Sequence, residues 1–285
     1  MANVMRVDDQ ADLTSSSADD QAASGGQRAG RFVRRHYTRV LGLAAVLIFL
    51  GAWQLASDTN LINPLFCSSP SLIWGELGTL ISTGQLWPNV WISGQEFLWG
   101  FGIAIVVGIP LGFLIGWYKP VGAIFSPFIT FLNAVPRVAL LPLFIIWVGI
   151  GIDLKIAVVL LGALIAILIN VVTGIQSLDP QAITMARSFG ASDFKIFRTL
   201  ALPGSVPYII SGIRVGLGHA LTGVVVGELY ASNAGIGHLI AAAGSTFETN
   251  LVFAGVVIIA IFGLIANGIL SLLEQHFADW RQSAR

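Results

Sequence analysis

The sequence predicts an all-α membrane protein with six transmembrane helices. Hydrophobic residues make up 55% of the 285 residues and charged residues only 11%, whereas soluble domains carry about 25% charged residues. Such a chain cannot cover its surface with polar side chains, so we place it in a bilayer, where about 20 apolar residues form one spanning helix. The apolar runs that approach this length are residues 40–56, 96–117, 121–148, 154–175, 205–231 and 250–272.

The first run follows a polar N-terminal stretch. Residues 1–35 are rich in Ser, Ala, Asp, Gln and Gly, a composition that cannot bury a core, and we expect a disordered cytoplasmic tail. A signal peptide has a short charged region and a short apolar region, but both are longer here. We therefore interpret residues 40–56 as an uncleaved anchor, with cleavage near Leu55-Ala56-Ser57 as the alternative.

Lysines and arginines between the runs predict the orientation, because they accumulate in cytoplasmic loops. With a cytoplasmic N-terminus, the opposite side receives Lys155 and little else. The sequence therefore predicts a multi-pass protein of the plasma membrane with both termini in the cytoplasm, a membrane domain at 36–280 and a cytoplasmic end at 281–285. The cations on the cytoplasmic side are Arg28, Arg31, Arg34, Arg35, Arg39, Lys119, Arg187, Lys195, Arg198, Arg281 and Arg285.

Two further features interrupt the regular pattern of spans. In the outer segment 58–95, Ser68-Ser69-Pro70-Ser71 combines capping serines with a proline in the first turn, which predicts a short amphipathic helix along the outer face. The third run contains Pro136 and Pro142, and each proline removes a backbone donor. A broken helix is tolerated where protein or water satisfies the freed groups, so this run is either kinked or re-entrant.

A polar segment, residues 179–203, separates the fourth and fifth runs, although helix connections usually need only about 2 to 8 residues. Asp179 is a suitable N-cap and Pro180 a suitable first helical residue. We expect a helix that ends at Gly190, because glycine accepts the positive φ found there. Its apolar stripe consists of Ala182, Met185, Ala186 and Phe189.

A second short helix is predicted after the glycine. Ser192 can cap it, Asp193 lies in its first turn, and we expect Leu202-Pro203 to end it. Two helices with a glycine elbow form a rigid shape, which predicts a docking surface for a soluble partner. The alternative is an interfacial segment held on anionic lipid by its cations. The expected apolar face of the second helix consists of Phe194, Phe197 and Ala201.

The 179–203 loop resembles the EAA loop of permeases from ATP-binding-cassette (ABC) importers. That pattern is Glu-Ala-Ala, three residues, Gly, and then an apolar residue and Leu-Pro downstream. Thr184 occupies the glutamate position and Met185 the first alanine position, so an acidic group of the pattern is missing here. The matching residues are Ala186, Gly190, Leu200, Leu202 and Pro203.

The resemblance extends over about residues 40–280. The stretches 133–143, 147–151 and 234–237 are similar to permeases of the taurine, aliphatic sulfonate and nitrate uptake group. It implies a type I ABC importer permease, the membrane subunit of an ATP-driven, binding-protein-dependent importer that moves a small organic or inorganic anion by alternating access. The implied partners are a cytoplasmic ABC ATPase dimer, an extracytoplasmic solute-binding protein and a second permease copy in a homodimer. No nucleic-acid partner is expected.

The same resemblance makes the loop the site of coupling to the ATPase. ATP and Mg²⁺ would be bound by that partner, because this chain lacks the Gly-x-x-x-x-Gly-Lys-Ser/Thr motif. We therefore expect a non-catalytic subunit without a cofactor, and the single Cys67 offers no metal cluster. The implied coupling residues are Ala186, Arg187, Gly190, Ala191, Ser192, Asp193, Phe194, Lys195, Phe197 and Arg198.

Polar residues inside the spans are candidates for the translocation pathway or a gate, since ionisable groups there usually face a cavity or a partner. We expect Arg137 to pair with Glu228 near the outer gate; contact with an anionic substrate, or an interfacial location without a special role, are the alternatives. Arg214 is expected to extend towards the inner headgroups. The pathway candidates are Asn133, Arg137, His219 and Glu228.

Glycines recur at every fourth position in the second run, at Gly108, Gly112 and Gly116. This spacing lets helix backbones approach closely, and we expect it to serve packing, with hinges or a dimer seam as the alternative.

Three other functions compete with import. An ion-coupled secondary transporter usually contains an internal repeat and an ion-coupling constellation, and neither is evident here. A membrane-embedded enzyme needs a catalytic cluster, and no Ser/His/Asp or His-Glu-x-x-His arrangement is present. A non-transporting scaffold subunit would tolerate changes in the 179–203 loop.

Overall fold

The computed structural model describes Tyr37 and residues 40–276, the last two without their side chains. The expected tail at 1–35 and the end at 281–285 lie outside the described residues. The chain forms two units, Met1–Pro64 and Leu65–Arg285, which are described separately. In the first unit, the predicted anchor is one apolar helix, Val40–Asp58.

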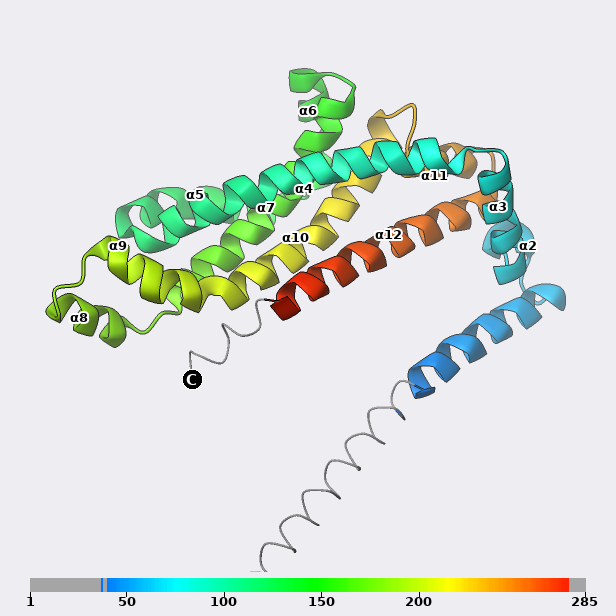
Figure 1. Cartoon of the computed structure of the whole chain (residues 1–285). Helices are drawn as coiled ribbons and strands as arrows, with labels where there is room; N and C mark the ends of the chain where they lie inside the picture. Colours follow the sequence, from blue (N-terminus) through cyan, green and yellow to red (C-terminus); the bar gives the residue numbers. More distant parts are fainter. Residues whose placement is uncertain (1–36, 38–39, 277–285) are drawn as a thin grey trace, which may run out of the picture. The chain divides into compact units, whose positions relative to one another are not determined.

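The second unit is built from helices, and the described residues contain no strand (Figure 1). The predicted all-α class is therefore confirmed. Its elements are α2 Pro64–Cys67, α3 Pro70–Ser82, α4 Leu86–Trp117, α5 Lys119–Ala134, η1 Arg137–Leu140, α6 Leu141–Val148, α7 Ile152–Gln176, α8 Pro180–Ser188, α9 Asp193–Ile196, η2 Phe197–Ala201, α10 Leu202–Ala231, α11 Ile236–Ser245 and α12 Thr249–His276.

The described helices include five that are long and apolar enough to cross a membrane, and six spans result if the bent pair α5 and η1–α6 counts as one. The two parts of this pair meet at 99°. The break lies at Val135, which adopts an extended conformation with ψ 126°, because the ring of Pro136 disfavours a helical residue before it. Pro142 starts α6 in its first turn, so only Pro136 interrupts the run.

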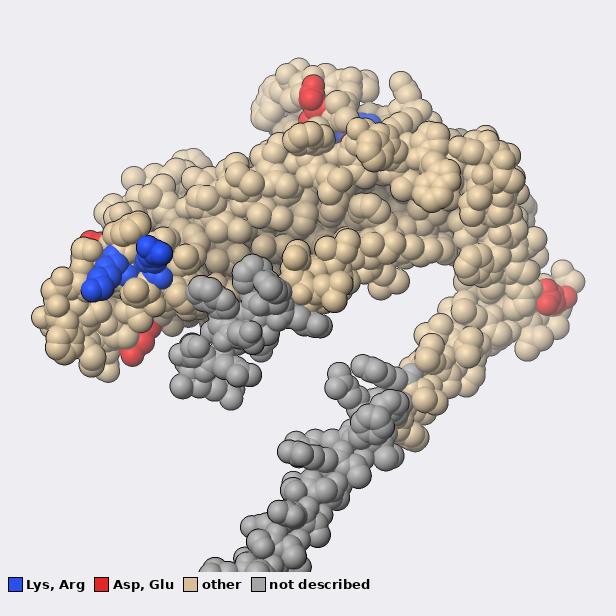
Figure 2. Space-filling model, in the orientation of Figure 1, with Lys and Arg blue, Asp and Glu red and all other residues tan. Residues whose placement is uncertain are grey.

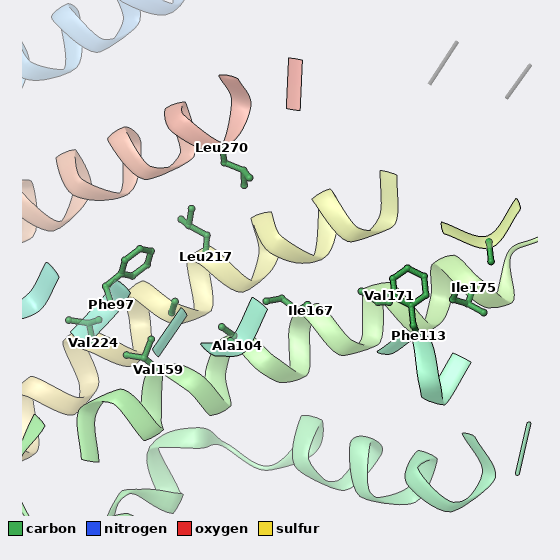
Figure 3. Packing of buried hydrophobic residues seen from close by; sticks show 13 residues of the cluster. Phe97, Ala104, Phe113, Val159, Ile167, Val171, Ile175, Leu217, Val224 and Leu270 are labelled. Atoms are coloured by element: carbon green, nitrogen blue, oxygen red, sulfur yellow. The ribbon is translucent and has the colours of Figure 1, made fainter. Parts of the chain in front are cut away.

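Helix α7 is the centre of the bundle and packs between α4 and α10. Figure 3 shows buried side chains of α4, α7, α10 and α12 meeting in one apolar cluster. The glycines of α4 make this packing close: a Cβ at Gly112 would lie 2.6 Å from the Cβ of Val171, and one at Gly116 would lie 2.8 Å from that of Ile175. These distances confirm the packing interpretation of the glycine repeat.

The outer helix predicted from the serines is α3. Its N-cap is Ser69, whose hydroxyl accepts the Leu72 N–H at 3.4 Å. Ile73, Leu77 and Leu80 form its buried face. Helix α4 then begins at Leu86, ten residues before the expected start at 96, because the polar residues of its first turns find partners on other helices.

The second helix of the 179–203 loop does not end where expected. Residues Asp193–Ala231 form one continuous helix of 39 residues, in which Pro203 lies in the first turn of α10. Just before it, η2 is a π-helical segment, and Leu202 donates its N–H to the carbonyl oxygen of Phe197. This wider turn relieves the clash between a proline ring and the preceding turn, so the helix continues.

Candidate functional site

The elbow between α8 and α9 is defined by backbone hydrogen bonds. The carboxylate of Asp179 caps α8 by accepting the Gln181 N–H at 2.8 Å. At the other end, Gly190 has φ +77° and donates to the Arg187 carbonyl at 2.9 Å, while the N–H of Ala191 donates to the Ala186 carbonyl at 3.1 Å. This pair of bonds is the Schellman arrangement, which requires a left-handed residue.

The start of α9 is capped as the sequence predicts. The hydroxyl of Ser192 accepts the Lys195 N–H at 3.4 Å. Across the elbow, Arg187 contacts Asp193 at 3.0 Å, with 58% and 64% of the side chains exposed. Such an exposed pair is worth about 0.2–1 kcal/mol, so the backbone caps contribute more to the angle between the helices than this ion pair does.

The 179–203 loop is anchored to the bundle through one face of its second helix. Ile196 and Ala201 are fully buried. The ring of Phe197 meets Phe113 edge-on at a centroid distance of 5.1 Å and Trp117 at 6.0 Å, both near the end of α4. These contacts join the elbow to α4, and α9 is continuous with the long helix that contains α10.

The opposite face carries apolar side chains that the chain itself does not cover. Helix α8, which the structure describes in full, contains no buried residue. Met185, Phe189 and Phe194 are 62%, 85% and 73% exposed. Phe194 was expected to share a face with Phe197 and Ala201; it points outward, because it lies two residues before the buried Ile196 and residues two apart do not share a helix face.

Basic side chains gather at the same end of the molecule (Figure 2). Arg187, Lys195 and Arg198 are exposed. The predicted coupling residues thus all lie in α8, the elbow, α9 or η2. Exposed apolar groups rimmed by polar ones are typical of a surface that binds another protein or a membrane. Beside this surface, a cleft of about 860 Å³ opens between α5, α7 and α8.

The four pathway candidates do not form one site. Asn133 is exposed in the last turn of α5, and Arg137 begins η1. His219 is half-buried in α10. Glu228 is 1% exposed and lies apart from them.

The expected pair of Arg137 and Glu228 is not formed among the described residues. One carboxylate oxygen of Glu228 accepts the Ser93 hydroxyl at 2.6 Å, and the other accepts the Gly237 N–H at 2.6 Å. Each carboxylate oxygen of Glu228 therefore has a partner other than Arg137. Arg214 pairs with Glu274 in the last turn of α12, and its expected reach towards the inner headgroups stays a prediction.

The end of the bundle opposite the 179–203 loop holds charged groups that the sequence did not reveal. Glu96 and Lys155 are 0% and 6% exposed and form an ion pair. Lys155 also donates to the Ser232 hydroxyl at 3.0 Å. We expected Lys155 to be a loop cation, but it lies buried in the first turn of α7. The available signal was the presence of Glu96 and Lys155 in apolar surroundings, since charged residues are rarely fully buried unless paired.

The chain is similar to proteins of a known family. Residues 108–279 match the family described as "Binding-protein-dependent transport system inner membrane component". The chain belongs to this family. It is an ABC transporter permease, a membrane subunit without catalytic activity of its own.

Two relatives match almost over their whole length. The taurine transport system permease protein TauC of Escherichia coli (strain K12) is 32% identical over 251 residues, covering 86% of this chain and 90% of TauC. The riboflavin transport system permease protein RibX of Chloroflexus aurantiacus (strain ATCC 29366 / DSM 635 / J-10-fl) is 32% identical over 254 residues, covering 89% of this chain and 95% of RibX.

Solved structures agree with the fold of the permease. A chain of an amino acid ABC transporter aligns with a TM-score of 0.54 and 17% identity, covering 70% of this chain and 97% of that one. A chain of the inward-facing MetNI methionine ABC transporter aligns with a TM-score of 0.51 and 19% identity, covering 66% and 97%. At these identities, the likeness supports the helical arrangement alone.

Proposed function

We propose that this permease is the membrane subunit of an ATP-driven importer, in which an extracytoplasmic binding protein delivers the substrate. Two copies of the chain form the pathway, and a cytoplasmic ATPase dimer docks on the 179–203 loop. The membrane is the plasma membrane, and both termini and the loop are cytoplasmic. ATP and Mg²⁺ are held by the ATPase, and this chain supplies the moving helices.

The observation that carries the proposal is the continuity of the helix Asp193–Ala231. Its 39 residues correspond to a length of roughly 58 Å at about 1.5 Å per residue. Its first turn belongs to the exposed elbow, where Phe194 is available to a partner, and its last turn lies at the opposite end of the bundle. A rigid element that joins a docking surface to the far side of the membrane is suited to transmit the closure of an ATPase dimer and thereby switch access.

The substrate class is a small organic anion of the sulfonate or carboxylate type, with nitrate as the inorganic alternative. The cleft next to the loop includes Lys119 and Arg187 in its lining, and none of its described lining residues is acidic. The TauC relative is named for taurine transport, and taurine is the first substrate to test.

The test is uptake of radiolabelled taurine by proteoliposomes that contain the permease and its cognate ATPase, with the cognate binding protein added outside. We expect uptake that requires ATP inside and the binding protein outside. Transport driven by a proton or sodium gradient without ATP would overturn the proposal in favour of secondary transport. A panel of sulfonates, carboxylates and nitrate then identifies the anion.

A loop variant separates a transporter from a scaffold. Gly190→Pro fits neither the positive φ nor the N–H bond at this position, so the elbow should change shape while the bundle assembles. We expect uptake to fall at least tenfold with the complex still isolated intact. Unchanged uptake in the Gly190→Pro complex would contradict the coupling role of the loop.

A further inference from the structure

Helix α11 depends on other helices for its N-terminal hydrogen bonds. The first turn of a helix leaves about four N–H groups without an internal partner, and the N-cap Gly235 has no side chain to supply one. Instead, the Gly235 N–H donates to the Asn89 side-chain oxygen at 2.8 Å, and the Ile236 N–H donates to the Ser93 hydroxyl at 2.9 Å. The Gly237 N–H donates to Glu228 at 2.6 Å. We call Asn89, Ser93 and Glu228 the polar clamp.

The carboxylate of Glu228 and the N-terminus of α11 also attract each other electrostatically. A helix N-terminus carries about +0.5 elementary charge, so it favours the carboxylate of Glu228. That carboxylate is 1% exposed, and burying it would be costly without hydrogen bonds. It receives one from α11 and one from the Ser93 hydroxyl of α4. Glu228 and the start of α11 therefore each lose a hydrogen-bond partner when the other is displaced.

The glycines of the 234–237 stretch permit this contact. A Cβ at Gly235, where φ is +111°, would collide with the carboxylate of Glu228. A Cβ at Gly237 would lie 2.8 Å from both the Cβ of Glu228 and the carbonyl oxygen of Val225. Larger residues at either position would force the start of α11 away from α10, so these glycines serve the approach of the carboxylate to the backbone.

A second contact fixes the end of α10 to the bundle. The ammonium of Lys155 joins Glu96 of α4 to Ser232, the residue that follows α10. The Ser232 hydroxyl in turn accepts the Ala234 N–H at 3.2 Å, just before α11. The connection between α10 and α11 is therefore held at both of its ends by buried polar contacts.

We propose that Glu228 is a positioning residue of the transport cycle, which fixes α11 to the end of α10 so that both move as one body. The inference rests on the proposed function and extends it: displacement of the 179–203 loop, carried along the helix Asp193–Ala231, moves α11 at the extracytoplasmic face. Helix α11 also packs on α12, and the clamp makes it follow α10.

The first test is hydrogen exchange measured by mass spectrometry on the intact reconstituted complex. In Glu228→Ala, we expect the amides at the start of α11 to exchange at least tenfold faster, while binding-protein-stimulated ATP hydrolysis is retained and uptake falls at least tenfold. Gly237→Ala should give the same faster exchange, retained ATP hydrolysis and reduced uptake, although the carboxylate of Glu228 is still present. This second variant keeps the test decisive if the Glu228→Ala complex does not assemble. Unchanged exchange and uptake in Gly237→Ala would overturn the inference.

The matched control is Ser205→Ala. Ser205 is another buried polar residue of α10, and its hydroxyl has no hydrogen-bond partner in the described part of the chain. Its removal should leave both the exchange of α11 and the uptake within twofold of the parent. A tenfold change in α11 exchange in this control would show that any buried change in α10 disturbs α11, which would contradict a specific role for Glu228.

The second test asks whether α10 and α11 move together. Val225 and Ile236 line the same small cavity, which residues of α4 and α12 also line, and a cross-linker applied to Val225→Cys with Ile236→Cys, in a Cys67→Ser background, would join the two helices. If the cross-linked protein takes up substrate within twofold of the reduced protein, the result supports the inference that α10 and α11 move as one body. If uptake stops on cross-linking and returns on reduction, the inference is overturned. Failure of the parent complex to take up substrate with ATP overturns the proposed function instead, because both tests of the clamp are compared with an active parent.

Discussion

The two ends of the helix Asp193–Ala231 differ in where their backbone caps come from and in which side chains they bury. At the 179–203 loop, the backbone caps itself and apolar side chains such as Phe194, 73% exposed, lack cover from their own chain. At the α11 end, the backbone is capped by other helices and Glu228 is buried. The conformation of the 179–203 loop is fixed by bonds within the loop itself. The contacts at the α11 end form only when α4, α7, α10 and α11 pack together. The contrast suggests that one end is built for binding another molecule and the other for holding the chain together.

The largest effect on stability is expected from Lys155→Ala. Removing Lys155 leaves Glu96, which is 0% exposed, without its cation, and breaking a buried ion pair costs about 3–5 kcal/mol. Thermal unfolding of the purified permease in detergent should show this loss. Replacing both partners, as in Glu96→Leu with Lys155→Leu, should recover part of it.

The matched control is Arg214→Ala, which breaks a pair with Glu274 whose side chains are 48% and 25% exposed. Exposed pairs contribute about 0–1 kcal/mol, so this variant should stay close to the parent. Equal losses for Lys155→Ala and Arg214→Ala would contradict the distinction between a buried end and an accessible surface.

A smaller loss is expected from Gly112→Ala, which tests the apolar middle between the two ends. Its Cβ would lie 2.6 Å from the Cβ of Val171, and overpacking of this kind costs about 1–3 kcal/mol. Gly102→Ala in the same helix is the control, because within the described part of the chain its Cβ meets nothing within 4 Å. The two melting temperatures should differ, with Gly102→Ala at or above the parent; a reversed order would refute close packing of α4 on α7.

The same contrast between the ends separates what the sequence predicts from what it does not. Asp179, Gly190 and Ser192 act within a few residues of themselves, so their caps can be predicted from local spacing and are present. Glu228 bonds to Ser93, which is 135 residues away, and local rules contain no information about such partners. For this reason the clamp was missed and Glu228 was assigned the wrong partner.

A local rule also failed where the chain adjusts its own geometry. Leu202-Pro203 is a sound stop signal, yet the π-helical segment η2 accommodates the proline and the helix continues. The predicted span 96–117 contains only the apolar part of α4, which begins at Leu86. In both cases the helix is longer than the sequence predicts.

Gly190→Ala should have a modest effect on stability, because alanine in a left-handed conformation costs about 1–2 kcal/mol. With φ at +77°, the elbow is expected to strain or open, and ATP-driven uptake should fall more than stability does. Comparison with Gly75→Ala, whose Cβ meets nothing within 4 Å in the described structure, isolates the backbone effect. Equal uptake by the two variants would contradict a defined elbow.

The smallest effect on stability is expected from Phe194→Ala, because a side chain that is 73% exposed contributes less than about 0.5 kcal/mol when replaced at a surface. Binding of the ATPase should nevertheless weaken at least tenfold, as measured by titration of the purified ATPase onto the permease in nanodiscs. Phe197→Ala is the matched opposite: its ring packs on Phe113 and Trp117, so its loss should lower the melting temperature. If Phe194→Ala bound the ATPase as tightly as the parent, the exposed ring would face lipid rather than protein, and the loop would have to be interpreted as an interfacial anchor.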